Sequence, residues 1–396
     1  MARRRALRAG LTAALCVPLL AVACGEPERP PPFGSGAGPG STAGADGGGI
    51  LIDGRAPDSP PTCGGDRIRA IVDPPTVYFV IDRSGSMAQE LDASGQSKYR
   101  AAWRAVGSLL RSIGHRLAYG AAVFPGYGDA ECGGAREIFP PLPGDPPGSA
   151  PPEQNGPTLQ VLLDRFAVQT PAGGTPTRAA LEQLASRITA LGDRTFVVLA
   201  TDGAPNCNEE LRCESGACIP DLEHHPYMDG VCGEGFSCCD PAQIGEGAGA
   251  NCIDQHGTVD AVAALSAAGV PTYVLGLPGS ETYASVLAAL ANAGGTARPG
   301  ETAYYAVSDA DALTEALFEI GTGIAIDCEL TLEAPPPHRD LVNVYFDGEV
   351  VPFEPAQGWD WTSDTALAIR GAACDTLRSG TVVEVQIVYG CRTIVR

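Results

Sequence analysis

The sequence predicts an α/β protein built on a doubly wound, mostly parallel β-sheet, with a disulfide-rich insertion and a small C-terminal all-β unit. Three observations support this prediction. Continuous apolar strands alternate with amphipathic helices across residues 70–325, seven cysteines lie close together in residues 206–252, and residues 328–396 are rich in strand signals. Strands that alternate with helices in this way form a parallel sheet with helices on both faces.

The expected strands are runs of β-branched, aromatic and other apolar residues, as in strands buried on both faces. The first run is VYFVI at 77–81, and the others lie at 117–124, 196–200, 270–277 and 304–307. Helices are expected where apolar residues recur at helical spacing, at 99–113, 177–191, 259–268, 283–293 and 309–320. Gly294 and Gly295 mark the end of the fourth helix, because glycine commonly terminates helices.

Three polar loops are expected at one edge of this sheet, where ligands bind beyond the carboxyl ends of the strands. The sequence DRSGS (82–86) follows the first strand, TDG (201–203) follows the strand at 196–200, and GGTPT (173–177) precedes the second helix. Among their side chains, two carboxylates and three hydroxyls are candidate ligands, and these are hard oxygen ligands of the kind that Mg²⁺ prefers. Gly85 gives the backbone freedom to turn Ser84 and Ser86 towards the same point.

These three loops, in this order, resemble the metal-ion-dependent adhesion site of von Willebrand factor type A (vWA) domains, which have a Rossmann-like fold. The motif residues of the family fall on Asp82, Ser84, Ser86, Thr175 and Asp202. Two further stretches, 268–276 and 287–296, resemble the later strand and helix of the family, so that the likeness covers residues 70–325. A lone Asp-x-Ser-x-Ser is a common turn pattern, whereas three matching loops after the right elements are specific.

The resemblance implies a site for Mg²⁺, or for Mn²⁺ or Ca²⁺, with these five side chains as metal ligands. It also implies that one coordination position stays open for an Asp or Glu carboxylate of a partner protein, because a metal with few negatively charged ligands still attracts such a group. The expected function is therefore metal-dependent protein binding, as in adhesion. The alternative is a domain of the same fold that binds no metal.

A cysteine-rich insertion separates Asp202 from the helix at 259–268. Its cysteines are Cys207, Cys213, Cys218, Cys232, Cys238, Cys239 and Cys252. Zinc sites generally combine two short Cys-x2-Cys or Cys-x4-Cys steps. Only one Cys-x4-Cys step occurs here, so disulfides are the favoured interpretation and zinc, with His224 and His225, is the alternative. Because the insertion directly follows Asp202, we expect it at the metal-binding edge, where it forms part of the rim that selects the ligand or else a passive stapled loop.

The number of cysteines suits a disulfide framework. Two of the 14 lie in the N-terminal leader described below, which leaves 12, an even number. The resemblance implies a bridge between Cys63 and Cys328, since several vWA domains tie their two ends together, and Cys374 would then pair with Cys391. Four further bridges are expected among Cys132 and the seven cysteines of the insertion, with about 105 connectivities left open.

Residues 328–396 are predicted to form a small β unit. Asp347-Gly348 lies between apolar runs at 342–346 and 349–351, which is a strong hairpin signal, and further strands are expected at 367–369 and 382–389. A unit of this size is marginal by itself, so we expect it to pack on the vWA domain. Trp359 and Trp361 are interpreted as core or seam residues rather than as a ligand shelf.

The N-terminal residues resemble the signal of a bacterial lipoprotein. A basic segment precedes the apolar stretch 11–23, which is too short to span a bilayer, and LAVAC (20–24) resembles a lipobox with Cys24 as the lipidated residue. Plain secretion is the alternative. Gly and Pro fill 18 of the 38 positions of residues 25–62, which predicts a disordered tether. We therefore expect an exported protein anchored in the bacterial cell envelope, on the outer membrane or cell surface.

The predicted organisation follows from these segments. It is a signal peptide at 1–23, a lipid-anchor cysteine and tether at 24–62, a vWA domain at 63–327 with its insertion at 206–252, and a β unit at 328–396.

The composition argues against several functions. The formal net charge is −21, from 47 acidic and 26 basic residues. Such a chain is a poor candidate for binding nucleic acid or anionic lipid surfaces, so we expect membrane contact through the lipid anchor only. The sequence contains no HExxH, GxSxG or P-loop motif, and its only lysine is Lys98. We expect no enzymatic activity; the alternatives are a structural envelope-assembly protein independent of metal and, less favoured, a hydrolytic enzyme.

Overall fold

The computed structural model describes residues 66–67, 70–71, 74–126, 132–151, 154–192, 194–227, 230–300, 302–325, 328–378, 382 and 385–395. The predicted signal peptide, the lipidated Cys24, the tether and Cys63 lie outside these residues. Within the described part of the chain, no helix is both long enough and apolar enough to cross a lipid bilayer.

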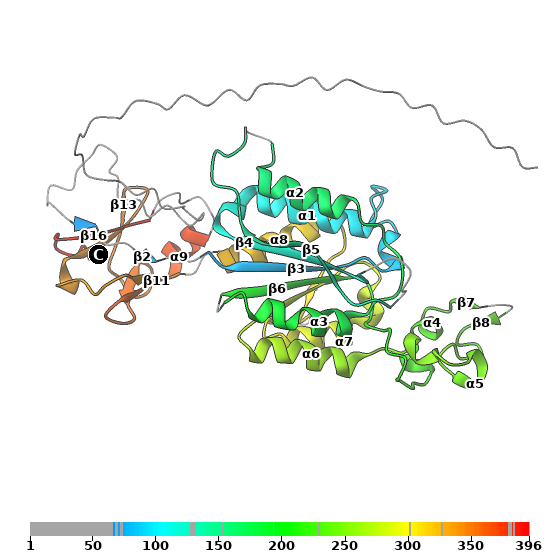
Figure 1. Ribbon diagram of the computed structural model, residues 1–396. Helices are drawn as coiled ribbons and strands as arrows, with labels where there is room; N and C mark the ends of the chain where they lie inside the picture. The colour runs from blue at the N-terminus through cyan, green and yellow to red at the C-terminus, as the bar shows by residue number, and fades with distance from the viewer. Residues whose placement is uncertain are drawn as a thin grey trace, which may run out of the picture. The chain divides into compact units, whose positions relative to one another are not determined.

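A six-stranded sheet forms the centre of the fold (Figure 1). Its strands are β3 (Thr76–Asp82), β4 (Ala118–Phe124), β5 (Arg136–Pro143), β6 (Thr195–Thr201), β9 (Thr272–Gly276) and β10 (Tyr305–Ala306). Their spatial order is β10-β9-β6-β3-β4-β5, and all neighbours are parallel except β4 and β5. The connections therefore run outward in opposite directions from the central pair, β3 and β6. This confirms the doubly wound, mostly parallel sheet that the sequence predicts.

Helices cover both faces of this sheet (Figure 1). One face packs against α1 (Lys98–Ile113), α2 (Pro157–Ala167) and α8 (Ala310–Ala325), and the other against α3 (Thr177–Thr189), α6 (Gln255–Ala267) and α7 (Ala284–Ala293). Strand β3 contributes to both cores, because Phe79 packs with the first group and Tyr78 with the second. Both side chains are fully buried, and full burial of a side chain such as phenylalanine is worth about 1.5–3 kcal/mol.

The sheet contains one strand that the sequence pattern does not predict. Strand β5 carries Pro140, Pro141 and Pro143, and proline argues against a strand because it cannot donate a hydrogen bond to a neighbour. The structure accommodates these prolines by placing β5 at the edge of the sheet, antiparallel to β4. Helix α2 is a second element absent from the prediction.

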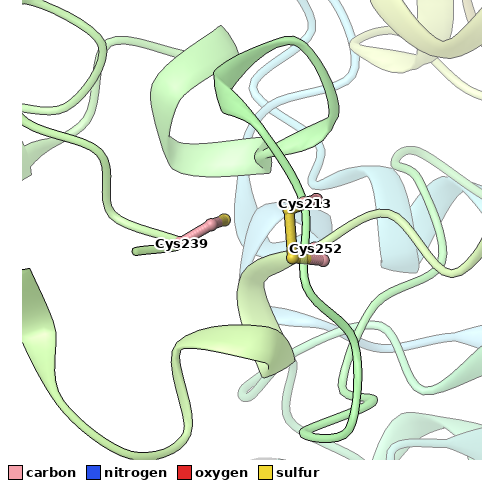
Figure 2. Close-up of side chains that lie close together, drawn as sticks. All are labelled: Cys213, Cys239 and Cys252. Atoms are coloured by element: carbon pink, nitrogen blue, oxygen red, sulfur yellow. A yellow bond between two sulfur atoms is a disulfide. The ribbon is translucent and has the colours of Figure 1, made fainter. Parts of the chain in front are cut away.

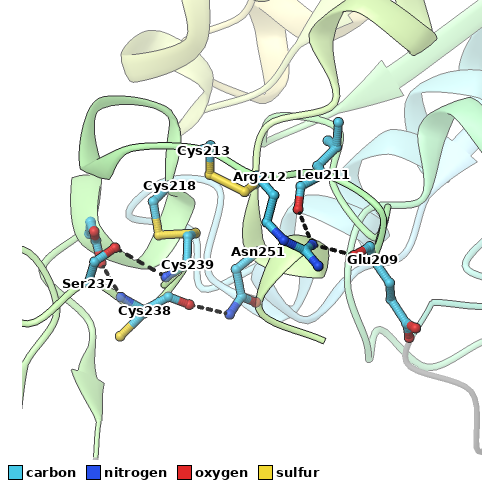
Figure 3. The surroundings of a disulfide bond; sticks show 11 residues. Glu209, Leu211, Arg212, Cys213, Cys218, Ser237, Cys238, Cys239 and Asn251 are labelled. Carbon is cyan, nitrogen blue, oxygen red and sulfur yellow. Dashed lines mark hydrogen bonds between the residues drawn. A yellow bond between two sulfur atoms is a disulfide. The ribbon is translucent and has the colours of Figure 1, made fainter. Parts of the chain in front are cut away.

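The insertion consists of short elements joined by disulfides (Figures 1 and 3). These elements are η3 (Ser215–Ala217), α4 (Ile219–Leu222), β7 (Pro226–Tyr227), β8 (Gly230–Val231), α5 (Pro241–Ile244) and η4 (Ala248–Asn251). The disulfides are Cys132–Cys207, Cys213–Cys252, Cys218–Cys239 and Cys232–Cys238. The prediction of four bridges among these eight cysteines is confirmed, and the first bridge ties the insertion to the segment between β4 and β5.

Disulfide sulfur atoms take the place of a larger apolar core in the insertion. Its buried cluster consists of Cys218, Cys232, Cys238, Cys239 and Cys252. Figure 2 shows the Cys213–Cys252 bridge with Cys239 nearby, and in Figure 3 the carbonyl of Cys238 accepts a hydrogen bond from Asn251 at 2.9 Å. Because all seven cysteines of the insertion are in disulfides, none offers the thiolate that zinc needs, and the zinc alternative is not supported.

The C-terminal unit contains two small antiparallel sheets, in the orders β1-β16-β12-β13 and β14-β15-β11-β2. Their elements are β1 (Asp66–Arg67), β2 (Ala70–Ile71), β11 (Glu329–Leu332), β12 (Val342–Phe346), β13 (Glu349–Val351), β14 (Trp359–Trp361), β15 (Ala366–Ile369) and β16 (Val385–Tyr389), with helix α9 (Gly371–Arg378) after β15. The predicted hairpin joins β12 to β13 through Asp347 and Gly348, whose φ angles of 48° and 85° suit a two-residue turn. Strands β1 and β2 precede the central sheet in the chain, yet β1 pairs with β16 and β2 with β11 in the C-terminal unit.

The predicted pairing of Cys63 with Cys328 and of Cys374 with Cys391 is wrong. Cys328 pairs with Cys374. Strand β11 begins directly after Cys328 and runs antiparallel to β15, so that the backbone N–H of Ile369 donates to the carbonyl of Cys328 at 2.6 Å. Helix α9 follows at once and brings Cys374 to Cys328, while Cys391 is disulfide-bonded elsewhere.

The core of the C-terminal unit continues the core around α1 and α8. Trp359 is fully buried in it, and Trp361 packs at its border with the Arg339 guanidinium 4.7 Å from its ring centre. Arg116 also donates from Nη2 to the carbonyl of Val382 at 2.6 Å. The two tryptophans therefore have the packing role that the sequence predicts.

Candidate metal centre

The three predicted loops meet at the carboxyl edge of the sheet, between β3 and β6. Asp82 is the last residue of β3, and the short helix η1 (Gly85–Ala88) follows it. Asp202 directly follows β6, and Thr175 lies just before α3. The strand order reverses between β3 and β6, and the diverging connections at such a point leave a crevice for ligands.

Four of the five predicted ligands form one hydrogen-bonded cluster. The Asp82 carboxylate accepts the backbone N–H of Ser84 at 2.6 Å and the hydroxyl of Thr201 at 2.6 Å. The Ser86 hydroxyl donates to Asp202 Oδ1 at 2.7 Å and lies 3.1 Å from the Ser84 hydroxyl. The two serines therefore link the two aspartates, which come from different loops.

The fifth predicted ligand, Thr175, lies in a loop that is bonded to the other two. Its backbone N–H donates to Asn206 Oδ1 at 2.7 Å, and its carbonyl accepts the N–H of Asn206 at 2.9 Å. Earlier in the same loop, the carbonyl of Gly173 accepts the N–H of Gly85 at 2.9 Å. The backbone thus holds the Thr175 loop against the cluster, while the hydrogen bonds within the cluster are made by the other four residues.

Both aspartates are buried, with 0% of Asp82 and 2% of Asp202 exposed. Burial, and next the negative charge of Asp202, raise the pKa of Asp82 from its usual 3.8 to about 7, although hydrogen bonds from Thr201 and Ser84 act to lower it. Two buried carboxylates that interact in this way need a cation or a proton to compensate their charge, because an uncompensated buried charge costs several kcal/mol.

Part of that compensation comes from Lys98, which the sequence pattern does not assign to the site. Its Nζ lies 2.8 Å from Asp202 Oδ2 and 3.0 Å from Gln89 Oε1. Thr201 and Asn206 are further site residues outside the predicted set, although Thr201 belongs to the TDG loop. The one sequence signal for Lys98 is that it is the only lysine in the chain.

The donor set suits a small divalent cation. Carboxylates and hydroxyls are hard oxygen ligands, the kind that such cations prefer. The residues that would hold the cation are Asp82, Ser84, Ser86, Thr175 and Asp202.

The strand order, the antiparallel edge strand and the three linked loops make the described part of residues 74–325 a doubly wound α/β domain whose loops resemble those of vWA domains. No protein-family model matches the sequence, and no curated protein is significantly similar to it. The resemblance to vWA domains therefore rests on the topology and the loops of the chain itself.

The chain is also similar, at low identity, to several solved structures. With the pilus adhesin SpaC of Lactobacillus rhamnosus GG it shares 16% identity and a TM-score of 0.45, over 83% of this chain and 40% of that one. With the vWF domain of the type V pili tip protein Mfa5 of Porphyromonas gingivalis the values are 11% and 0.41, over 64% of this chain and 96% of that one. With manganese-loaded TRAP protein of Plasmodium vivax they are 14% and 0.34, over 67% and 88%. The chain thus spans less than half the length of SpaC.

Proposed function

We propose that this protein is an exported, envelope-anchored lipoprotein whose vWA-like domain binds a divalent cation, with Mg²⁺ as the first candidate, and through it an acidic group of a partner protein. The observation that carries the proposal is the pair of buried carboxylates, Asp82 and Asp202, linked through Ser84 and Ser86 where the strand order reverses. Anchoring through Cys24 rests on the N-terminal sequence alone.

A bound cation would supply an open coordination position for an outside ligand. Mg²⁺ takes about six oxygen ligands, and the five candidate side chains leave at least one position for another group. With only two negatively charged ligands, such a cation still attracts a carboxylate. The protein contributes the arrangement of its own oxygens: Thr201 orients Asp82, and Ser86 orients Asp202. We propose that the serine hydroxyls act as ligands and that the protein binds rather than catalyses.

The insertion contacts elements beside this centre and is proposed to form part of its rim. The hydroxyl of Tyr283, just before α7, donates to Glu223 of the insertion at 2.8 Å. Ala204, two residues after Asp202, packs in the same small apolar cluster as Tyr283 and Ile219. These contacts support the proposal that the insertion restricts which acidic partners approach the centre.

Metal titration of the full mature protein tests the proposal directly. Isothermal titration calorimetry with Mg²⁺ and Mn²⁺ should show binding that Asp82→Ala abolishes. The matched control Asp260→Ala removes an exposed carboxylate of α6 and should leave the Kd unchanged. Thermal melts of both variants identify any loss of folding.

Partner capture extends the test to the ligand. The mature protein should retain envelope or extracellular proteins in Mg²⁺, and these should be lost in EDTA and with Asp82→Ala. Recovery of the same set under all three conditions would contradict metal-dependent binding.

A metal-independent role in envelope assembly is the second candidate function. The Lys98–Asp202 ion pair favours it, because the ammonium already offsets one of the two buried carboxylates. Capture that persists in EDTA, together with calorimetry that shows no Mn²⁺ binding, would identify this role.

A further inference from the structure

Lys98 is held inside the candidate metal centre by three elements. It is the first residue of α1 and is 4% exposed. Its Nζ contacts Asp202 Oδ2 and Gln89 Oε1. The loop after β9 covers it from another side, because a Cβ on Gly279 would lie only 3.1 Å from Nζ. Gly279 has a φ of +106°, which other residues rarely adopt, so this close approach depends on glycine.

This position is unfavourable for a positive charge unless a carboxylate offsets it. The N-terminus of a helix carries partial positive charge and disfavours a cation there, and burial removes the hydration of the ammonium. The start of α1 does not need the lysine, because the Ser97 side chain caps the helix by accepting the N–H of Arg100. The contact with Asp202 accounts for the placement, since the two side chains are 5% and 0% exposed.

Both oxygens of the Asp202 carboxylate already have a donor in this arrangement. Ser86 donates to Oδ1 at 2.7 Å, and Lys98 donates to Oδ2 at 2.8 Å. A divalent cation that uses Asp202 as a ligand therefore shares this carboxylate with the two donors. It also meets a carboxylate whose charge the ammonium already offsets.

We propose that Lys98 is a built-in counter-cation, which neutralises Asp202 while no metal is bound and lowers the affinity of the centre for a divalent cation. This inference rests on the metal-dependent function proposed above. It identifies Lys98 as a residue that sets the Kd of the centre for a divalent cation. When both carboxylates are ionised, the ammonium leaves the metal-free centre with a single negative charge. A divalent cation then makes the centre positive, whereas without Lys98 it would make the centre neutral.

The test is to remove the charge of Lys98 in the full mature protein and to titrate Mn²⁺ by calorimetry. In Lys98→Gln and Lys98→Met, the Kd for Mn²⁺ should fall about tenfold or more, as expected for removal of a close buried like charge. In EDTA both variants should melt at a lower temperature than the wild type, because Asp202 has lost its partner. Saturating Mn²⁺ should then raise their melting temperature by more than it raises that of the wild type.

Three features of the design separate this role from a merely structural one. Damage to the fold would weaken metal binding, which is opposite to the expected change. Lys98→Gln keeps a hydrogen-bond donor near Asp202, so it decides the question if Lys98→Met does not fold. The control Arg100→Met removes an exposed positive charge on the same helix and should leave the Kd within about twofold of the wild type, because exposed charges are screened.

The outcomes also separate this inference from the function on which it rests. Equal or weaker Mn²⁺ affinity in Lys98→Gln overturns the counter-cation role alone. Absence of Mn²⁺ binding by the wild type and by both variants overturns the metal centre itself and the inference with it.

Discussion

The central sheet and the cysteine-rich insertion adjoin the same candidate centre but are stabilised in different ways. The sheet is held by apolar side chains packed on both faces, whereas the insertion has elements of two to four residues and a buried cluster made of half-cystines. Apolar burial is independent of the redox environment, and disulfides are not. The comparison indicates that the ligand residues, carried by the sheet, and the rim, carried by the insertion, can be perturbed separately.

The largest effect is expected from a cavity in the sheet. Phe79→Ala removes a fully buried ring from the central strand and should lower the free energy of unfolding by about 3–5 kcal/mol, the usual cost of such a cavity. Denaturant unfolding measures this loss. The matched control Val168→Ala shortens a side chain that is 73% exposed and should change stability little. A loss at Phe79 no larger than at Val168 would contradict the role of the apolar core.

The buried carboxylate of Asp82 should make the sheet sensitive to pH. Its pKa is raised from 3.8 in the unfolded chain to about 7 in the folded one, chiefly by burial. Between pH 3.8 and about 7 the folded state binds more protons than the unfolded state. In EDTA the Asp82 carboxyl should therefore stabilise the fold most below pH 4 and lose that contribution as the pH rises to 7. The slope is at most about 1.4 kcal/mol per pH unit.

Unfolding of Asp82→Asn across the same range isolates this contribution. As the pH rises from 4 to 7, the free energy of unfolding of the variant should increase relative to that of the wild type, because Asn stays neutral. A difference that does not change with pH would contradict the raised pKa. Protection of the insertion against proteolysis should not follow this titration, which sharpens the contrast between the two regions.

Loss of a disulfide should open the insertion and leave the sheet intact. The double variant Cys218→Ser, Cys239→Ser removes a bridge between two fully buried residues, and the local stability should fall by about 2–4 kcal/mol. Hydrogen exchange should show lost protection within 208–251 and unchanged protection in β3 and β6. The control Cys328→Ser, Cys374→Ser, in the C-terminal unit, should leave exchange in the insertion unchanged.

The smallest effect is expected at the contact between the two regions. Tyr283→Phe removes the hydrogen bond to Glu223 and should lower the local stability of the insertion by about 0.5–1.5 kcal/mol. Faster amide hydrogen exchange in α4 (Ile219–Leu222) measures this loss. Tyr345→Phe, in the C-terminal unit, is the matched control. If exchange in the insertion is the same in both variants, this hydrogen bond does not contribute to holding the rim.

The parts of the fold that the sequence predicts are those with a strong local pattern. The run at 77–81 lies within β3, the apolar spacing from residue 99 lies within α1, and Asp347-Gly348 forms its hairpin. The loops at Asp82 and Asp202 are predictable because a buried strand precedes each of them. In all these cases the information lies within a few neighbouring residues.

The parts that the sequence does not predict depend on partners far apart in the chain. The prolines of strand β5 are tolerated only because β5 pairs with β4 alone, at the edge of the sheet. Cys328 bonds Cys374 because β11 pairs with β15. Lys98 and Asp202 lie 104 positions apart, and no local pattern joins them.

The sequence by itself determined the elements of the sheet, the oxygen-rich loops at its edge and the set of eight cysteines that form four bridges. Only the tertiary structure decided which cysteines pair, which strands complete the C-terminal unit and which cation faces Asp202. The physical reason is that backbone preference and apolar periodicity act over a few residues, whereas disulfides, strand pairing and buried ion pairs form between segments that only the folded chain brings together.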